Sequence, residues 1–175
     1  MALPVRITLL ILLLCSLNVS AENTGSGVDS LSFMAGNWQA ARYFKDQRNN
    51  WVRADEKSVT FDITDSGKFI TADLQQQEDQ RHIMISWDQY QNKYRAVVMD
   101  HSTGLLDVYT GNIRSGELFL TNGRETFNMV DGKRIFNRYA IRQNESGFTI
   151  ETYRFVVGEE TDWVQITKTE FSGKQ

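Results

Sequence analysis

The chain has 175 residues, a formal net charge of −3, and a single cysteine and a single proline. This length is typical of one domain of ordinary size, and a mildly acidic chain lacks the basic face that nucleic-acid binding requires. After residue 21 no stretch is apolar enough to form a membrane-spanning helix. We therefore expect one domain with neither a nucleic-acid partner nor a membrane span.

Residues 1–21 have the pattern of a cleavable signal peptide. Arg6 supplies a short positive region, Leu9–Leu17 an apolar region, and Val19–Ala21 a small-residue cleavage site. The apolar run is shorter than the roughly 20 residues that a membrane helix needs. The mature chain is therefore expected to begin at Glu22.

Cleavage there removes both the cysteine and the proline. The alternative is a lipoprotein signal with Cys15 as the lipidated residue, but the bulky Leu14 stands where such signals prefer a small residue. A mature exported domain without cysteine has no disulfide, whereas small secreted eukaryotic domains usually contain several. We expect export to a bacterial periplasm, with secretion as the alternative.

The mature chain is expected to start with a leader and continue as one domain. Residues 22–30 are rich in Gly, Ser and Asn and predict a flexible leader, followed by a domain over residues 31–173. A short helical turn is predicted over Asp29–Met34, with Asp29 or Ser30 as its cap.

From Gly36 onward the chain is a series of strand-like runs, rich in Val, Ile, Thr, Tyr and Phe and separated by turn residues. The runs are Asn37–Lys45, Lys57–Thr64, Lys68–Gln75, Arg81–Trp87, Lys93–Asp100, Leu105–Ile113, Glu117–Thr121, Arg124–Val130, Arg134–Arg142, Phe148–Val157 and Trp163–Phe171. Short turns such as Asp131-Gly132 make consecutive strands antiparallel neighbours. About ten strands without covering helices predict an all-β fold, an antiparallel up-and-down barrel; an open sandwich is the alternative.

Two groups of motifs carry a resemblance to a known family. Phe33–Trp38 places Gly-x-Trp at the start of the first strand, and Ile85–Gly111 contains the pattern Trp-Asp, Tyr-Arg, Asp-His-Ser-Thr-Gly and Tyr-Thr-Gly. Over Leu31–Phe171 the chain resembles exported bacterial lipocalin-like (calycin-type) barrel domains of unknown function. The resemblance implies a closed barrel with Trp38 plugging one end, and it brings no catalytic residues.

The two histidines are the side chains expected to titrate near neutral pH. His82 lies in an alternating strand and is interpreted as solvent-facing. His101 follows Asp100 directly, and adjacent residues of a strand point to opposite faces. An Asp100–His101 dyad could therefore form only if the strand ends and the turn begins at these two residues. His101 and Asp100 are weak catalytic candidates, with Asp88 and Glu125 as other carboxylates. Two isolated histidines give no metal-ligand spacing, and we expect neither a metal nor a cofactor.

Arginines in the last strands are the other notable polar feature. If Phe136 faces the barrel interior, Arg138 does too, because the two residues are two positions apart. A buried arginine must be paired or must await an anion. We favour the alternative, in which Arg138, Arg142 and Arg154 face outward and pair with Glu151 or Glu170.

The function that we expect is non-enzymatic binding of a small hydrophobic or amphipathic ligand inside the barrel. The candidate ligand-binding residues are Trp38, Trp87, Tyr94, Tyr109, Arg138 and Tyr153. One alternative is a small periplasmic enzyme, an isomerase, cyclase or hydrolase, that uses His101 with a nearby carboxylate. Another is a structural or interaction protein whose interior is filled with aromatic side chains. The sequence leaves the oligomeric state open.

Overall fold

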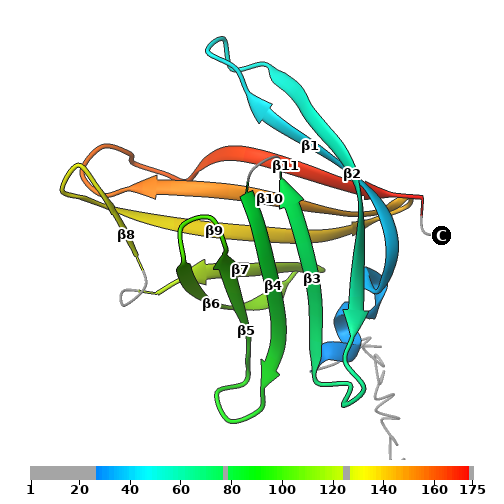
Figure 1. Ribbon diagram of the computed structural model, residues 1–175. Coiled ribbons are helices and arrows are strands. Elements are labelled where there is room, and N and C mark those ends of the chain that lie inside the picture. Colours follow the sequence, from blue (N-terminus) through cyan, green and yellow to red (C-terminus); the bar gives the residue numbers. More distant parts are fainter. Residues whose placement is uncertain (1–26, 77–78, 124–126, 174–175) are drawn as a thin grey trace, which may run out of the picture.

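The computed structural model describes residues 27–76, 79–123 and 127–173 (Figure 1). The expected signal peptide, residues 1–21, and residues 22–26 of the expected leader lie outside the described residues. The elements are η1 (Val28–Met34), β1 (Gly36–Lys45), β2 (Trp51–Ile63), β3 (Phe69–Gln76), β4 (Asp79–Asp88), β5 (Lys93–Asp100), β6 (Leu105–Arg114), β7 (Glu117–Asn122), β8 (Asn128–Val130), β9 (Lys133–Asn144), β10 (Gly147–Val156) and β11 (Val164–Ser172).

Ten antiparallel strands close into a barrel, which confirms the predicted fold class. β1 to β7 follow one another around the wall, β9, β10 and β11 continue it, and β11 pairs with β1 to complete the circle. The short strand β8 is an addition that pairs with β9 alone. Closure removes the unpaired sheet edges that an open sandwich would present.

Two strands differ from the sequence prediction. β2 begins at Trp51, six residues before the expected start at Lys57, and pairs with β1 through most of its length. Several of these early β2 residues are charged, so they lack the apolar alternation that marks a half-buried strand. β8 covers only Asn128–Val130 of the run expected over Arg124–Val130, and residues 124–126 lie outside the described residues.

The barrel has a closed end and an open end. η1 lies at the closed end, where Trp38 Nε1 donates to the Met34 carbonyl at 2.8 Å and the Tyr94 hydroxyl donates to the Gly27 carbonyl at 2.9 Å. The structure thus places Trp38 as the expected plug. Neither of the expected caps acts on η1, because Gly27 occupies the cap position and no side chain bonds there.

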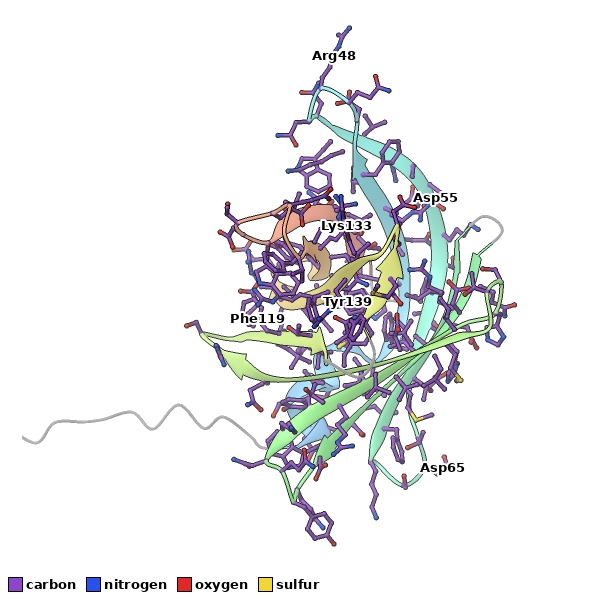
Figure 2. All side chains as sticks on the ribbon, turned by 90° about the vertical axis from the view of Figure 1, so that its left-hand side faces the viewer. Arg48, Asp55, Asp65, Phe119, Lys133 and Tyr139 are labelled. Carbon is purple, nitrogen blue, oxygen red and sulfur yellow. The ribbon has the colours of Figure 1, made fainter. Side chains whose placement is uncertain are left out.

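The strand hairpins alternate between the two ends. Figure 2 shows Arg48, in the β1–β2 hairpin, and Asp65, in the β2–β3 hairpin, at opposite extremes of the molecule. The β1–β2, β3–β4 and β5–β6 hairpins therefore all surround the open end.

The half of the barrel next to η1 is packed solid with apolar side chains. Phe148 and Phe171 stack with ring centroids 4.3 Å apart, and Phe61 and Trp38 meet Phe148 edge-on at 5.4 and 5.2 Å. These four side chains are at most 5% exposed. Aromatic packing of this kind stabilises the closed end and leaves no room for a ligand among these four rings.

The barrel wall is splayed between β2 and β3. Of the thirteen residues of β2, only Phe61–Ile63 pair with β3, opposite Ile70–Ala72. The rest of β2 follows β1 outward into the β1–β2 hairpin, which projects from the barrel in Figure 1. The open end is therefore wider than the closed end.

Candidate functional site

A cavity of about 240 Å³ lies inside the open half of the barrel. Its lining combines polar and apolar side chains in nearly equal parts, and its floor is made by two tyrosines. The lining residues are Arg81, Val98, Asp100, Leu105, Asp107, Tyr109, Asn128, Asn137, Tyr139, Thr152 and Ile166. A larger hollow, of about 410 Å³, lies at the other end of the barrel beside η1 and is lined in part by Trp87. We take the cavity of the open half as the candidate binding site, because charged side chains and the buried Tyr109 converge on it.

Strand alternation places these side chains on the inner wall. Arg81 is two residues before Ile83 in β4, so it shares the face that the apolar residues of that strand turn inward. Asp107 and Tyr109 lie two apart in β6, and Tyr109 is only 2% exposed. The polar residues of the cavity therefore stand at positions that continue the core face toward the open end.

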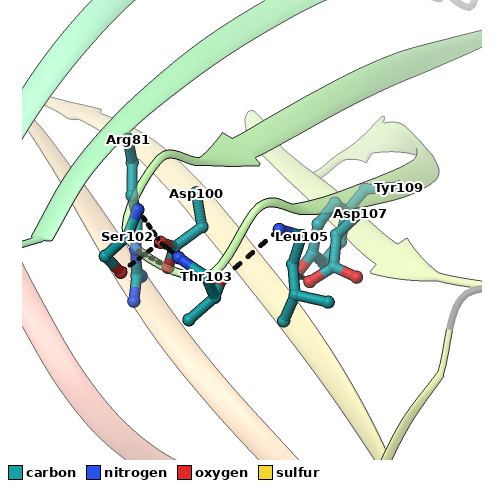
Figure 3. Close-up of polar contacts among 7 residues, drawn as sticks. All are labelled: Arg81, Asp100, Ser102, Thr103, Leu105, Asp107 and Tyr109. Atoms are coloured by element: carbon teal, nitrogen blue, oxygen red, sulfur yellow. Dashed lines mark hydrogen bonds and ion pairs between the residues drawn. The ribbon is translucent and has the colours of Figure 1, made fainter.

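Asp100 is held by a dense set of donors at the β5–β6 hairpin. Its carboxylate accepts from the Ser102 hydroxyl at 2.6 Å and from the amides of Ser102 and Thr103 at 3.0 and 3.2 Å, and it lies 3.4 Å from Arg81 Nε (Figure 3). The Ser102 hydroxyl bond, the two amide bonds and the Arg81 charge together lower the pKa of Asp100 to about 2. Asp100 is therefore ionised at neutral pH and already paired.

Asp107 has a different environment in the same cavity. The Tyr109 hydroxyl donates to Oδ2 at 3.4 Å, and the Asn128 side chain also hydrogen bonds to Asp107. Burial raises the pKa of Asp107, and the Tyr109 and Asn128 bonds and the Arg81 charge offset only part of that effect. Both hydrogen-bonding partners of Asp107 are neutral, in contrast to the arginine beside Asp100.

The two floor tyrosines connect the acidic and basic groups. The Tyr109 and Tyr139 rings pack with centroids 4.9 Å apart and their hydroxyls hydrogen bond, while Tyr139 also bonds to Arg81. Burial raises the pKa of both hydroxyls, so they stay protonated and can donate. A hydrogen-bonded chain thus runs from Arg81 through the tyrosines to Asp107.

The wall beside the floor is fixed by a buried amide. Asn122, at the end of β7, is 2% exposed and is the buried polar residue of the described core. Its Oδ1 accepts from the Asn137 backbone N–H at 2.7 Å, which joins β7 to β9 where the two strands diverge. This bond positions the neighbouring cavity residues, Asn137 and Tyr139, of β9.

Exposed apolar side chains stand at the mouth of the cavity. Leu105 lines the cavity, and Val130 stands two residues after the lining residue Asn128 on β8, so it shares that residue's face. Leu105 and Val130 are each more than half exposed. We call these two residues the apolar rim.

A second polar group faces the interior from β1 and β2. Arg42 Nε lies 3.3 Å from Asp55 Oδ1, and both side chains are about one-fifth exposed. Lys57 and Val59 line the same small pocket as this pair, beside the splayed wall. The open half of the barrel is therefore polar on two sides.

The proposed catalytic pair is not assembled. The His101 side chain is exposed, and it makes no hydrogen bond or ion pair with any residue that the structure describes. Asp100 turns inward to Arg81, as expected for adjacent strand residues. Asp88 pairs with Arg95 at 2.8 Å in β4–β5, and Glu125 lies outside the described residues. The enzyme hypothesis thus lacks its expected base.

Only Tyr109 among the six expected ligand-binding residues lines the cavity. Trp38 and Tyr94 are buried in the closed half, and Trp87 packs edge-on against Tyr94 at 4.8 Å. Arg138 and Tyr153 pair with each other and alternate with the lining residues Asn137 and Thr152, so they face away from this cavity.

The outward orientation that we favoured holds for Arg138 and Arg142 but not for Arg154, which lies opposite the cavity residue Asn137 on the inner face. Their partners differ from the expected Glu151 and Glu170, and Arg142 pairs with Glu117. The Arg138 guanidinium lies 3.9 Å from the centroid of the Trp163 ring, and Arg154 pairs with Glu160 at 3.2 Å. The Tyr153 hydroxyl donates to Glu151 at 2.6 Å. The long β10–β11 connection brings Trp163 and Glu160 close, and cross-strand spacing alone does not predict them.

The described residues contain no group of three or more His, Cys, Asp and Glu side chains that could hold a metal ion. Within the same residues, no helix has the length and hydrophobicity that crossing a membrane requires.

Comparison with known proteins shows the fold and no more. No family model matches the chain, and no curated protein matches its sequence. The crystal structure of Rv2717c from M. tuberculosis is similar to this chain with a TM-score of 0.53 and 12% sequence identity, over 85% of this chain and 97% of that one. The chain thus has the closed-barrel architecture of a solved protein.

Proposed function

We propose that this protein binds a small amphipathic molecule at the open end of the barrel. The observation that carries the proposal is the cavity of about 240 Å³, which combines polar lining residues with an apolar rim. Binding sites are concave and use a few placed polar groups to orient a ligand that is otherwise buried by apolar contacts. The polar group of the ligand would enter the cavity, and its apolar part would lie along the rim.

The lining supports a binding function rather than a purely structural one. Charged groups inside a barrel cost desolvation energy, and an apolar core of the same shape would be at least as stable. The closed half is filled with aromatic rings, so the fold does not need a polar interior for closure. The charged interior, with Asp107 beside the paired Arg81 and Asp100, is therefore best explained by a binding function.

Fluorescence of N-phenyl-1-naphthylamine provides the test. Binding should raise its emission, and Val98→Phe, which projects a ring into the cavity, should weaken binding at least about tenfold. Val97→Phe is the matched control, because Val97 is adjacent on β5 and faces outward. Thr152→Phe fills the same cavity from β10 if Val98→Phe fails to fold. Equal binding by cavity-filled and control proteins would refute the site.

We also propose that the protein is an exported lipocalin-like domain whose signal peptide is cleaved after Ala21. The support is the Arg6, Leu9–Leu17 and Val19–Ala21 pattern, together with a mature sequence free of cysteine. Amino-terminal sequencing of the protein from a periplasmic extract should give Glu22 as the first residue. A first residue at Met1, or a lipidated Cys15, would contradict the proposal.

A further inference from the structure

We propose that the polar group of the ligand is a protonated amine and that Asp107 binds it. This inference rests on the proposed function, because it assigns the chemistry of the same cavity. The two carboxylates that line the cavity, Asp100 and Asp107, have different bonding partners.

Asp100 already has its partners. It accepts three hydrogen bonds from the β5–β6 hairpin, and Arg81 stands beside it at 3.4 Å. A ligand cation would have to compete with an arginine for this carboxylate. Asp100 therefore acts to fix the hairpin and Arg81 rather than to receive a ligand.

Asp107 accepts hydrogen bonds only from neutral groups among the described residues, the Tyr109 hydroxyl at 3.4 Å and the Asn128 side chain. A carboxylate has about four sites for hydrogen bonds, and two weak or neutral donors leave it poorly compensated for its burial. Figure 3 shows Asp107 beside Tyr109 and Leu105, away from the hydrogen-bonded cluster that holds Asp100. The Arg81 charge also acts on Asp107, but Arg81 lies against Asp100, so Asp107 is the carboxylate without a hydrogen-bonded cation among the described residues.

The charge of the whole lining agrees with a cationic ligand. Arg81 is the one basic side chain among the described lining residues, and Asp100 and Asp107 are the two acidic ones. Arg81 lies against Asp100, is hydrogen bonded to Tyr139 and also acts on Asp107, so one cation serves two carboxylates and the described lining keeps one net negative charge. An ammonium group would neutralise it and form charge-assisted hydrogen bonds, which are roughly twice as strong as neutral ones.

An anionic head group fits less well. It would have to displace Asp100 or Tyr139 from Arg81 and would then lie near the Asp107 charge, which is repulsive. An alcohol could hydrogen bond with the tyrosine hydroxyls but would leave the Asp107 charge uncompensated. Among simple polar head groups, the primary ammonium matches the lining best.

Three probes with the same eight-carbon chain test the head group: octylammonium, octanol and octanoate. Titration calorimetry at pH 7 should show octylammonium binding roughly ten- to a hundredfold more tightly than either of the others. Asp107→Asn should reduce octylammonium affinity to that of octanol and leave octanol affinity unchanged. Asp62→Asn, the same change on an exposed residue of β2, is the control and should change nothing.

The outcomes separate this inference from the proposed function. If the three probes bind equally, or octanoate binds most tightly, the cavity binds amphipathic molecules but the ammonium assignment is wrong. If octylammonium is preferred and Asp107→Asn has no effect, Asp107 is not its partner and the inference is overturned. If no probe binds the folded protein, the proposed function fails as well.

Discussion

The Asp107 carboxylate and the Tyr109 hydroxyl, two residues apart on β6, lie 3.4 Å apart on the inner wall of the barrel. Because β residues two positions apart share a face, both side chains point into the cavity of the open half. Tyr109 also hydrogen bonds to Tyr139, so it links the acidic wall of the cavity to its floor.

Replacing Tyr109 with Phe tests this link. The Tyr109 hydrogen bond lowers the pKa of Asp107, so its removal should raise that pKa further. The variant should also lose about 1 kcal/mol of unfolding free energy, because a buried hydrogen bond disappears while the ring stays. Carboxyl-detected NMR titration measures the pKa, and urea unfolding measures the stability. An unchanged Asp107 titration would show that the two groups do not interact.

The lowered pKa of Asp100 predicts that the protein loses stability in acid. Its pKa is lowered from 3.8 to about 2 in the folded protein, so it stabilises the fold above its unfolded pKa, and this contribution is lost as the pH falls toward 2. Wild-type protein should therefore lose stability between about pH 4 and pH 2, and Asp100→Asn should lose less over that range. The measurement is the urea midpoint against pH. Parallel curves for the two proteins would contradict the assignment.

The raised pKa of Asp107 predicts that its contribution to stability changes with pH in the opposite direction to that of Asp100. Its pKa is raised, so the folded state favours the protonated carboxyl and loses that contribution as the pH rises. Asp107→Asn should therefore melt at a higher temperature than wild type at pH 7, and the difference should shrink below about pH 4. Differential scanning calorimetry at both pH values checks this. A lower melting temperature at pH 7 would mean that the ionised carboxylate stabilises the fold.

Gly111, on the inner wall, is expected to tolerate no larger residue. A Cβ built there would lie 1.6 Å from the Phe119 carbonyl oxygen on β7. Because this neighbour is backbone, Gly111→Ala should cost about 3 kcal/mol or more through displacement of the β6–β7 pair. Gly123→Ala is the control, since its Cβ would have no neighbour within 4 Å and the cost should stay within about 0.5 kcal/mol. Equal urea midpoints would refute the packing argument.

The Arg138→Ala variant distinguishes binding in the cavity from binding on the outer face. Its guanidinium stacks on Trp163 at 3.9 Å, so Arg138→Ala should lose about 1 kcal/mol of stability. The same variant should bind N-phenyl-1-naphthylamine with unchanged affinity, because Arg138 lies outside the barrel. A substantial loss of probe affinity in a folded Arg138→Ala protein would move the binding site to the outer wall.

The turns and the apolar face were predictable from the sequence because their causes are local. Asp131 and Gly132 have φ values of 50° and 76°, the positive values that a two-residue hairpin requires and that these residue types favour. Ile83 and Ile85 alternate with His82, Met84 and Ser86 and face the core, as predicted. The sequence also correctly predicted that Trp38 would be buried at one end.

The polar cavity was not predicted, because its residues break the pattern that reveals an inner face. Asp55 and Lys57 point inward from β2, and their charge made the start of that strand resemble a loop. Arg81 shares the inward face of Ile83, and Asp107 that of Tyr109, so this shared position in the alternation was the available signal. Which polar residues meet inside the barrel depends on closure between strands far apart in the sequence.

The central claim is that the open-end cavity is the binding site, and chemical-shift mapping with octylammonium tests it most directly. Titration of the ¹⁵N-labelled protein should shift the backbone amides of Asp107, Tyr109 and Tyr139, with one saturating curve for all three. Amides on the outer face, such as those of Arg138 and Tyr153, should stay within the general background. Saturating shifts confined to the outer face or to η1, with the cavity amides unmoved, would contradict the account.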